Sequence, residues 1–175
     1  MGRPLRIGLV LSTAGSVLNE TLRDPFLRER VALVVADRPC EGITKLEAYG
    51  LEVELIERPD RSEFCDVLLD RLREREIDYV LSYSVEFYSE RLRSAYEDRI
   101  LNFHPSLLPA FKGMDGFGDA VSYPARFTGN TVELIAEVMD EGKIVMQTVC
   151  PIDRSRPISV TRHRVFEQQC KALLQ

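Results

Sequence analysis

Residues 5–36 read LRIGLVLSTAGSVLNETLRDPFLRERVALVVA, and this stretch decides the fold. Its two ends, 5–11 and 31–36, are apolar except for Arg6, a pattern typical of strands that are buried on both faces. Residues 13–16 between them form a turn, and residues 16–23 are expected to be helical. A strand, a helix and a second strand in this order predict two parallel strands joined by a helical crossover.

The same alternation continues to residue 103. The expected helices are 43–49, ending at Gly50, then 64–72, with Asp60 and Glu63 as a capping box, and 87–96; the expected strands are 51–56, 77–83 and 99–103. The sequence therefore predicts an α/β fold, a Rossmann-like open, mostly parallel sheet with helices on both faces. Ligands of such sheets bind beyond the carboxyl ends of the strands, which points to the turn at 13–16 and to the segment after Phe103.

The second part of the chain differs in character. Residues 104–126 are rich in proline and glycine and show little periodicity, and an irregular stretch of that length usually has a function. Two strands are expected at 127–138 and 143–150, joined by a loop, and a closing helix at 159–174. With no repeat or convincing linker, residues 1–175 are expected to form a single domain.

Composition and charge exclude several classes of protein. The chain has 23 Lys and Arg against 28 Asp and Glu, a net charge of −5, and we therefore expect no nucleic-acid partner. No apolar run approaches the roughly 18 residues of a membrane span, and no secretory signal is visible, so we expect a cytoplasmic protein without a membrane partner. For the oligomeric state we expect either a monomer or a homodimer. We expect no metal site, because there are only two histidines and the four cysteines are scattered: Cys40, Cys65, Cys150 and Cys170.

The segment with the most chemistry is 101–113, LNFHPSLLPAFKG. Asn102 and His104 stand two residues apart at the end of an expected strand, where alternate side chains share a face. An amide and an imidazole can therefore point at the same ligand atom. Two prolines stiffen the chain that follows.

This run resembles the signature of the folate-dependent formyltransferases, Asn-x-His-Pro-Ser-Leu-Leu-Pro followed by an aromatic residue, a basic residue and glycine. The family's second motif, in a strand–loop–strand, is matched by Thr128, Gly129, Thr131, Val132, Asp140, Gly142, Ile144 and Gln147. The resemblance extends from Leu5 to about Gln168 and implies the formyltransferase fold. In size the chain is most similar to the glycinamide ribonucleotide branch of the family.

The resemblance implies that Asn102, His104 and Asp140 are catalytic and that a formyl group passes from the co-substrate 10-formyltetrahydrofolate to a primary amine of a small molecule, without a metal. Such a transfer passes through a tetrahedral oxyanion, which Asn102 and a protonated His104 would stabilise. Asp140 would favour the imidazolium through its opposite charge and would carry the amine proton. By the same resemblance Asp140 also contributes to the folate site.

Two loops depart from the glycinamide ribonucleotide branch. The turn after the first strand is Ser12-Thr13-Ala14-Gly15-Ser16-Val17, where only Gly15 and Ser16 remain of a phosphate-binding sequence. We expect these two residues to contact the substrate, with a plain strand-to-helix turn as the alternative. In the folate-side loop, an acid, Glu86, stands where that branch has arginine. The expected folate contacts in and before this loop are Tyr83, Val85, Phe87 and Tyr88, with the packing of a helix start as the alternative for Phe87.

Two further departures affect the acceptor. Glu133 stands where the glycinamide ribonucleotide enzymes have a histidine, and Phe117 lies near another such position. We expect Glu133 to bind the substrate amine, to raise the pKa of a neighbouring group, or to point to solvent. On the closing helix, Phe166 and Gln169 occupy the positions that read the glycinamide end, so Gln169 is a predicted substrate contact. These changes favour an acceptor other than glycinamide ribonucleotide.

Two other functions remain open. The chain could be a 10-formyltetrahydrofolate hydrolase, which passes the formyl group to water, or a folate- or nucleotide-binding homologue with little catalysis. A nicotinamide-dependent oxidoreductase is not indicated, because the first turn lacks Gly-x-Gly-x-x-Gly. His163 is expected to be a solvated helix residue, and Leu108-Pro109 matches a position where the family often has a cis peptide bond.

Overall fold

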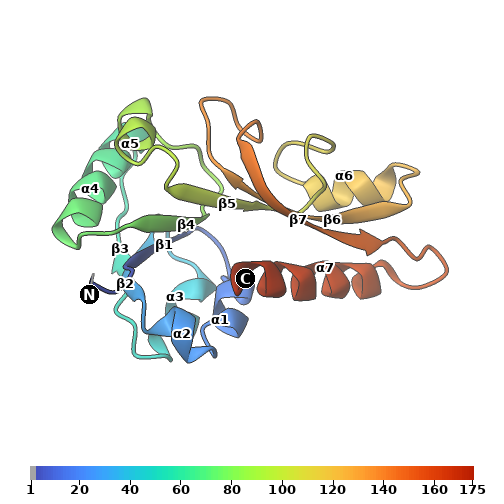
Figure 1. Cartoon of the computed structure of the whole chain (residues 1–175), viewed down its shortest axis with the longest axis horizontal. Helices are drawn as coiled ribbons and strands as arrows, with labels where there is room; N and C mark the ends of the chain where they lie inside the picture. The colour runs from blue at the N-terminus through green and yellow to red at the C-terminus, as the bar shows by residue number, and fades with distance from the viewer. Residues whose placement is uncertain (1–2) are drawn as a thin grey trace. The chain divides into compact units, whose positions relative to one another are not determined.

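The computed structural model describes residues 3–175, which form an α/β fold with a mixed, mostly parallel sheet (Figure 1). Within these residues seven strands follow the order β3-β2-β1-β4-β5-β6-β7. The chain divides into two compact units, a first unit up to Leu101 and a second unit over Asn102–Gln175. Strand β5 (Ile100–His104) contains the division. The expected α/β class is confirmed, whereas the expectation of a single domain stays a prediction.

The first unit is built on parallel strands. Strand β1 (Ile7–Leu11) pairs in parallel with β2 (Val31–Ala36) and with β4 (Tyr79–Tyr83). All five residues of β1 are buried, which explains its uninterrupted apolar sequence. Strand β3 (Glu54–Leu55) has two residues instead of the expected six, because only this part of the 51–56 segment pairs with the end of β2.

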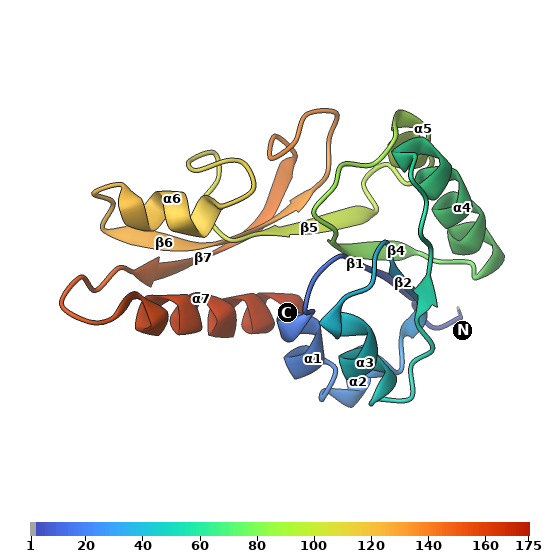
Figure 2. The ribbon, with the colours of Figure 1, turned by 180° about the vertical axis from the view of Figure 1, so that it is seen from behind.

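Helices cover both faces of these strands, with α1 and α3 on one side and α4 and α5 on the other (Figures 1 and 2). The bounds are α1 (Ser16–Thr21), α2 (Pro25–Arg28), α3 (Glu41–Glu47), α4 (Arg61–Glu74) and α5 (Glu90–Ala95). The predicted cap of α4 is confirmed, since the Asp60 side chain accepts hydrogen bonds from the backbone of Ser62 and Glu63. Helix α5 begins later than expected, because Ser89 caps it.

The second unit is built around an antiparallel pair, β6 (Phe127–Leu134) and β7 (Lys143–Pro151). Helix α7 (Ile158–Leu173) packs on one face of this pair and α6 (Gly116–Ser122) on the other (Figure 1). The expectation that 104–126 is irregular was wrong for α6, whose first turn is capped by the Asp115 side chain. The predicted cis bond at Leu108-Pro109 is confirmed. None of the helices within residues 3–175 is both long and apolar enough to cross a bilayer.

Candidate active site

Strand β5 carries two of the three predicted catalytic residues. Asn102 is half-buried and His104 is buried, and their spacing places them on the same face of the strand. The loop that follows is braced from β6 and β7. The Thr131 hydroxyl donates to the Ser106 carbonyl at 2.7 Å and accepts from the Leu108 N–H at 3.0 Å, while the Gln147 amide donates to the Leu108 carbonyl at 2.8 Å. Thr131 and Gln147 of the second motif thus hold the first motif in shape.

The imidazole of His104 meets an acceptor at each ring nitrogen. Its Nε2 lies 2.8 Å from the Phe111 carbonyl, and its Nδ1 lies 3.4 Å from Asp140 Oδ1. A carbonyl can only accept, so Nε2 carries a proton, and a second proton on Nδ1 would face the carboxylate. The side chains of His104 and Asp140 are 5% and 4% exposed, which makes this a buried pair. The structure therefore brings together two residues 36 positions apart in the sequence.

Asp140 is held by the loop that follows the first motif. Its Oδ2 accepts the Gly113 N–H at 2.7 Å, which leaves Oδ1 directed at the imidazole. The backbone of Asp140 is left-handed, with φ at 58°, a conformation that aspartate tolerates better than most residues. On the surface beside it, Lys112 and Glu141 form an ion pair at 2.7 Å.

Glu133 lies in the same cluster and is 1% exposed. Its Oε1 accepts from Asn102 Nδ2 at 3.3 Å, and its Oε2 accepts from the Gly142 N–H at 2.9 Å. Burial raises the pKa of the Glu133 carboxyl above its usual value, and the hydrogen bonds from Asn102 and Gly142 oppose that rise. The expectation that it points to solvent is wrong, whereas its contact with a substrate stays a prediction.

Gly116, at the start of α6, is a site residue that the sequence did not indicate. A Cβ atom there would lie 2.5 Å from His104 Nε2 and 2.7 Å from the Phe111 carbonyl oxygen. Only glycine fits, because the imidazole and its carbonyl partner occupy the space. A glycine in a glycine-rich loop gives no local signal of such a contact.

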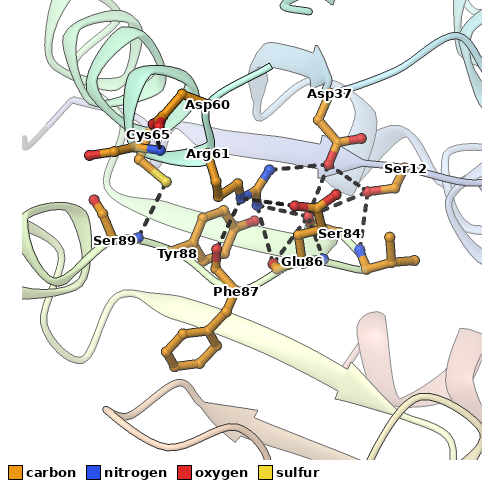
Figure 3. Close-up of polar contacts among 12 residues, drawn as sticks. Ser12, Asp37, Asp60, Arg61, Cys65, Ser84, Glu86, Phe87, Tyr88 and Ser89 are labelled. Carbon is orange, nitrogen blue, oxygen red and sulfur yellow. Dashed lines mark hydrogen bonds and ion pairs between the residues drawn. The ribbon is translucent and has the colours of Figure 1, made fainter. Parts of the chain in front are cut away.

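A second polar cluster lies in the first unit, where β1, β2 and β4 end (Figure 3). The buried carboxylate of Asp37 accepts from the Ser12 hydroxyl at 2.8 Å, the Ser84 hydroxyl at 3.2 Å, Arg38 at 3.0 Å and Arg61 at 3.2 Å. Arg61 also donates to the carbonyls of Phe87 and Glu86 and to the Ser84 hydroxyl. Sequence reasoning missed Asp37 and Arg61, since neither belongs to a motif.

The predicted folate contacts lie on or beside the loop that this cluster holds. Val85 is half-buried, and its N–H donates to the Ser12 hydroxyl at 3.0 Å. The half-buried ring of Phe87 points away from the cluster (Figure 3). The Arg93 guanidinium lies over this ring, 4.6 Å from its centroid. Tyr88 is buried with its hydroxyl 2.8 Å from Ser82 Oγ, and burial raises its pKa to about 12. Tyr83 is half-buried at the end of β4. Their roles in folate binding stay predictions.

The remaining predicted contacts are Gly15 and Ser16 in the first unit and Gln169 in the second. Gly15 is buried with a left-handed backbone, φ 58°, and Ser16 is exposed at the first position of α1. Lys45 donates to the Ala14 carbonyl at 3.1 Å in the same turn. Gln169 donates to the Asn130 side chain at 3.1 Å. The structure gives no further test of a phosphate or an acceptor at these residues.

His163 and Phe117 lie outside the groups described so far, and a metal site is a separate question. His163 has a side chain that is 69% exposed, as expected, and it lies against the Phe166 ring. Phe117 is buried in a small core with Cys150 and Val165. Among residues 3–175 there is no group of three or more His, Cys, Asp or Glu side chains that could hold a metal ion.

Comparison with known proteins adds to this geometry. The family model "Formyl transferase" matches residues 8–175. The chain belongs to the formyl transferase family. A phosphoribosylglycinamide formyltransferase of Bacillus subtilis is 30% identical over 145 residues, which cover 80% of this chain and 74% of the relative.

Other family members show how the match is distributed. The human trifunctional purine biosynthetic protein adenosine-3 is 29% identical over 168 residues, covering 91% of this chain but only 17% of that protein's length. The crystal structure of glycinamide ribonucleotide transformylase 1 from Geobacillus kaustophilus superposes with a TM-score of 0.88 at 31% identity, covering 97% of this chain and 94% of that one.

Proposed function

We propose that this member of the formyl transferase family transfers a formyl group from 10-formyltetrahydrofolate to a primary amine of a small-molecule acceptor. The observation that supports the proposal most is the buried pair of His104 and Asp140, with 3.4 Å between Nδ1 and Oδ1. Asn102 is linked to the same cluster through Glu133. An amide and an imidazole can donate to the oxyanion of acyl transfer between nitrogen atoms, and a carboxylate can carry the proton.

When bound, 10-formyltetrahydrofolate would supply the formyl carbon on its N10 atom. Asn102 and His104 would donate N–H groups to the formyl oxygen as it gains negative charge. The Nδ1 contact with Asp140 is longer than an ordinary hydrogen bond, so the N–H at Nδ1 is the one more readily available to the substrate. The Nε2 contact with the Phe111 carbonyl would keep the ring in place.

Asp140 would then transfer the proton of the amine to N10 of the folate. The amine nitrogen bonds to the formyl carbon, the bond from that carbon to N10 breaks, and the proton lost by the amine ends on N10. Oδ2 of Asp140 is occupied by the Gly113 N–H, so Oδ1 would accept and return the proton, directly or through water.

The loop 84–88 suits the aromatic part of a folate in one respect. Val85 and Phe87 are half-buried apolar side chains on a loop whose backbone is fixed by Ser12 and Arg61. A fixed loop with an apolar surface favours binding of a flat ring, because little conformational entropy is lost. In this arrangement Tyr88 would support the loop from inside, since its hydroxyl is bonded to Ser82.

We further propose that the acceptor differs from glycinamide ribonucleotide, and that the enzyme is cytoplasmic and acts as a monomer or a homodimer. Glu133 replaces a histidine beside the reacting groups. Gln169 is bonded to Asn130, and Phe166 lies against His163 on α7. If Gly15 and Ser16 hold a phosphate of the acceptor, they do so without the full sequence that the nucleotide-using relatives have.

The test is a formyl-transfer assay with the purified chain, 10-formyltetrahydrofolate and a panel of primary amines that includes glycinamide ribonucleotide. His104→Ala should lower turnover by about 10³-fold, because it removes both an oxyanion donor and the partner of Asp140. Asp119→Asn, at an exposed carboxylate on α6, is the matched control and should leave turnover unchanged.

The outcomes separate the parts of the proposal. Full activity of the H104A variant would overturn the mechanism. Rapid formylation of glycinamide ribonucleotide would keep the transfer and overturn the altered acceptor. Release of formate with no acceptor product would favour the hydrolase. A thermal-shift screen with folates gives an independent measure of donor binding, since a ligand of the folded state raises the melting temperature.

A further inference from the structure

Glu133 differs from the proposed catalytic residues in having both carboxylate oxygens bonded to different parts of the protein. Oε1 accepts from Asn102 on β5, and Oε2 accepts from the backbone of Gly142, two residues after Asp140. We propose that Glu133 is a positioning residue: it fixes the amide of Asn102 and the turn at 140–142 relative to each other. This inference rests on the proposed function, because Asn102 and Asp140 are catalytic only if formyl transfer is the reaction.

The chemistry of the carboxylate decides how Asn102 is oriented. An ionised carboxylate has acceptors and no donor, so Asn102 must present its NH₂ end to it. The 3.3 Å contact uses one of the two N–H groups and leaves the other to donate elsewhere. A histidine or glutamine in place of Glu133 could donate instead, and would then face the carbonyl end of the same amide.

The turn at 140–142 is fixed by the second oxygen. The Gly142 N–H donates to Oε2 at 2.9 Å, and a Cβ at Gly142 would lie 2.9 Å from that oxygen and 2.0 Å from the Leu134 carbonyl oxygen. Asp140, with its left-handed backbone, is the third residue of the hydrogen-bonded turn Val138–Glu141, which leads into Gly142. The position of the Asp140 carboxylate against His104 therefore depends on a turn that Glu133 holds.

A bulge in the hairpin places Glu133 there. Val132 pairs with Met146, whereas Glu133 pairs with Ile144, so the register of β6 and β7 shifts between the two residues and Val145 has no opposite partner. Bulges re-aim side chains and are frequent beside active sites. The carboxylate is thereby brought to Asn102 and Gly142 with almost none of its surface exposed.

Direct binding of the substrate amine by Glu133 is the competing role. A substrate ammonium group could reach the carboxylate only by displacing the Asn102 or Gly142 contact, since both oxygens are in use. The two roles differ in one respect: a positioning residue acts through Asn102 and Asp140, and a binding residue acts independently of both.

A double-mutant cycle on turnover separates them. Asn102→Ala should lower kcat by about 10²–10³-fold, the loss expected for one oxyanion donor. Glu133→Gln should lower kcat by about 10²-fold with little change in KM, because a misplaced amide costs that much. The double variant should lose clearly less turnover than the product of the two single losses, because the part of the E133Q loss that acts through Asn102 is already gone. Glu137→Gln, at an exposed glutamate in the loop between β6 and β7, is the matched control.

Nuclear magnetic resonance of the ¹⁵N-labelled wild type gives a measurement that needs neither a substrate nor a stable variant. One Asn102 side-chain N–H should be shifted downfield and exchange slowly with water, and E133Q should remove the shift while E137Q does not. A wild-type Asn102 amide with free-exchanging, unshifted protons would overturn the inference.

The remaining outcomes are distinct. Losses in E133Q and N102A that multiply fully in the double variant would show that Glu133 does not act through Asn102 and would overturn the inference. An E133Q loss confined to KM would show that Glu133 binds the substrate directly. If the wild type transfers formyl to no amine, the proposed function fails, and the resonance measurement alone decides whether Glu133 orients Asn102.

Discussion

Asp37 in the first unit and Glu133 in the second are both buried carboxylates, but their partners differ in charge. Asp37 has a side chain that is 3% exposed and meets two guanidinium groups as well as two hydroxyls. Arginine is charged at every working pH, so the charge of Asp37 is balanced permanently. The network around it is complete within the first unit.

Glu133 meets only neutral donors, the Asn102 amide and the Gly142 backbone. The nearest titratable groups are Asp140, which raises its pKa, and His104, which lowers it. Among residues 3–175, no lysine or arginine is one of the groups that act on the Glu133 carboxyl. Buried carboxylates beside an imidazole are typical of active sites. A buried carboxylate that is paired with two arginines is more typical of a structural ion-pair network.

The largest test of this comparison is the loss of the Asp37 charge. Asp37→Asn keeps the shape of the side chain but removes the buried anion that Arg61 and Arg38 share, leaving them the exposed carboxylate of Glu86, and the free energy of unfolding should fall by about 3 kcal/mol. Chemical denaturation measures it. The control is Asp66→Asn, which breaks an exposed ion pair with Arg91 and should cost less than about 1 kcal/mol. Equal losses of unfolding free energy in D37N and D66N would show that the Asp37 network does not stabilise the fold.

The sequence was sufficient for the elements whose cause is local. Uninterrupted apolar runs predicted β1 and β2, because strands buried on both faces need no polar positions, and Asp60 predicted the start of α4. The short β3 and helix α6 were not predicted. The first depends on how far the neighbouring strand reaches, and the second on a glycine-rich turn that only its packing makes helical.

In the candidate site, too, features with a local cause were predicted and features that depend on distant segments were not. The i, i+2 spacing of Asn102 and His104 follows from strand geometry, but the meeting of His104 with Asp140 was expected only from a resemblance, because 36 residues separate them. The two partners of Glu133 depend on a register shift between β6 and β7 that no sequence pattern marks. The contact of Gly116 with the imidazole is equally non-local.

A second test asks whether the His104 cluster is tuned for reaction and not for stability. Gly116→Ala inserts a methyl group 2.5 Å from His104 Nε2, so the imidazole and the Phe111 carbonyl must separate. Turnover should fall by about 10²-fold, because a shift of about 1 Å in a reacting group has that effect. Steady-state kinetics and a melting curve measure the two consequences.

The matched control for that change is Gly50→Ala, where the added methyl group meets nothing within 4 Å. Gly50 has a φ of 76°, so this variant should lose stability from backbone strain and keep its turnover. A G116A variant that melts at a lower temperature but reacts at the wild-type rate would place Gly116 with the structural braces.

The smallest expected effect is on the pH dependence of stability, and it follows from the neutral partners of Glu133. Its pKa is raised above 4.5 by burial, so the folded chain binds this proton more tightly than the unfolded chain does. The stabilisation from that proton is fully present below the unfolded pKa and is lost as the pH rises through the folded pKa. Glu133→Gln cannot ionise and lacks this loss.

Melting temperatures of the wild type, E133Q and the exposed control E137Q from about pH 4 to about pH 8 measure the difference. The wild type should lose about 2 °C relative to E133Q across that range, while E137Q should follow the wild type. Parallel curves for all three would mean that Glu133 is compensated as fully as Asp37, and the contrast between the two carboxylates would then be one of partner identity without an energetic consequence.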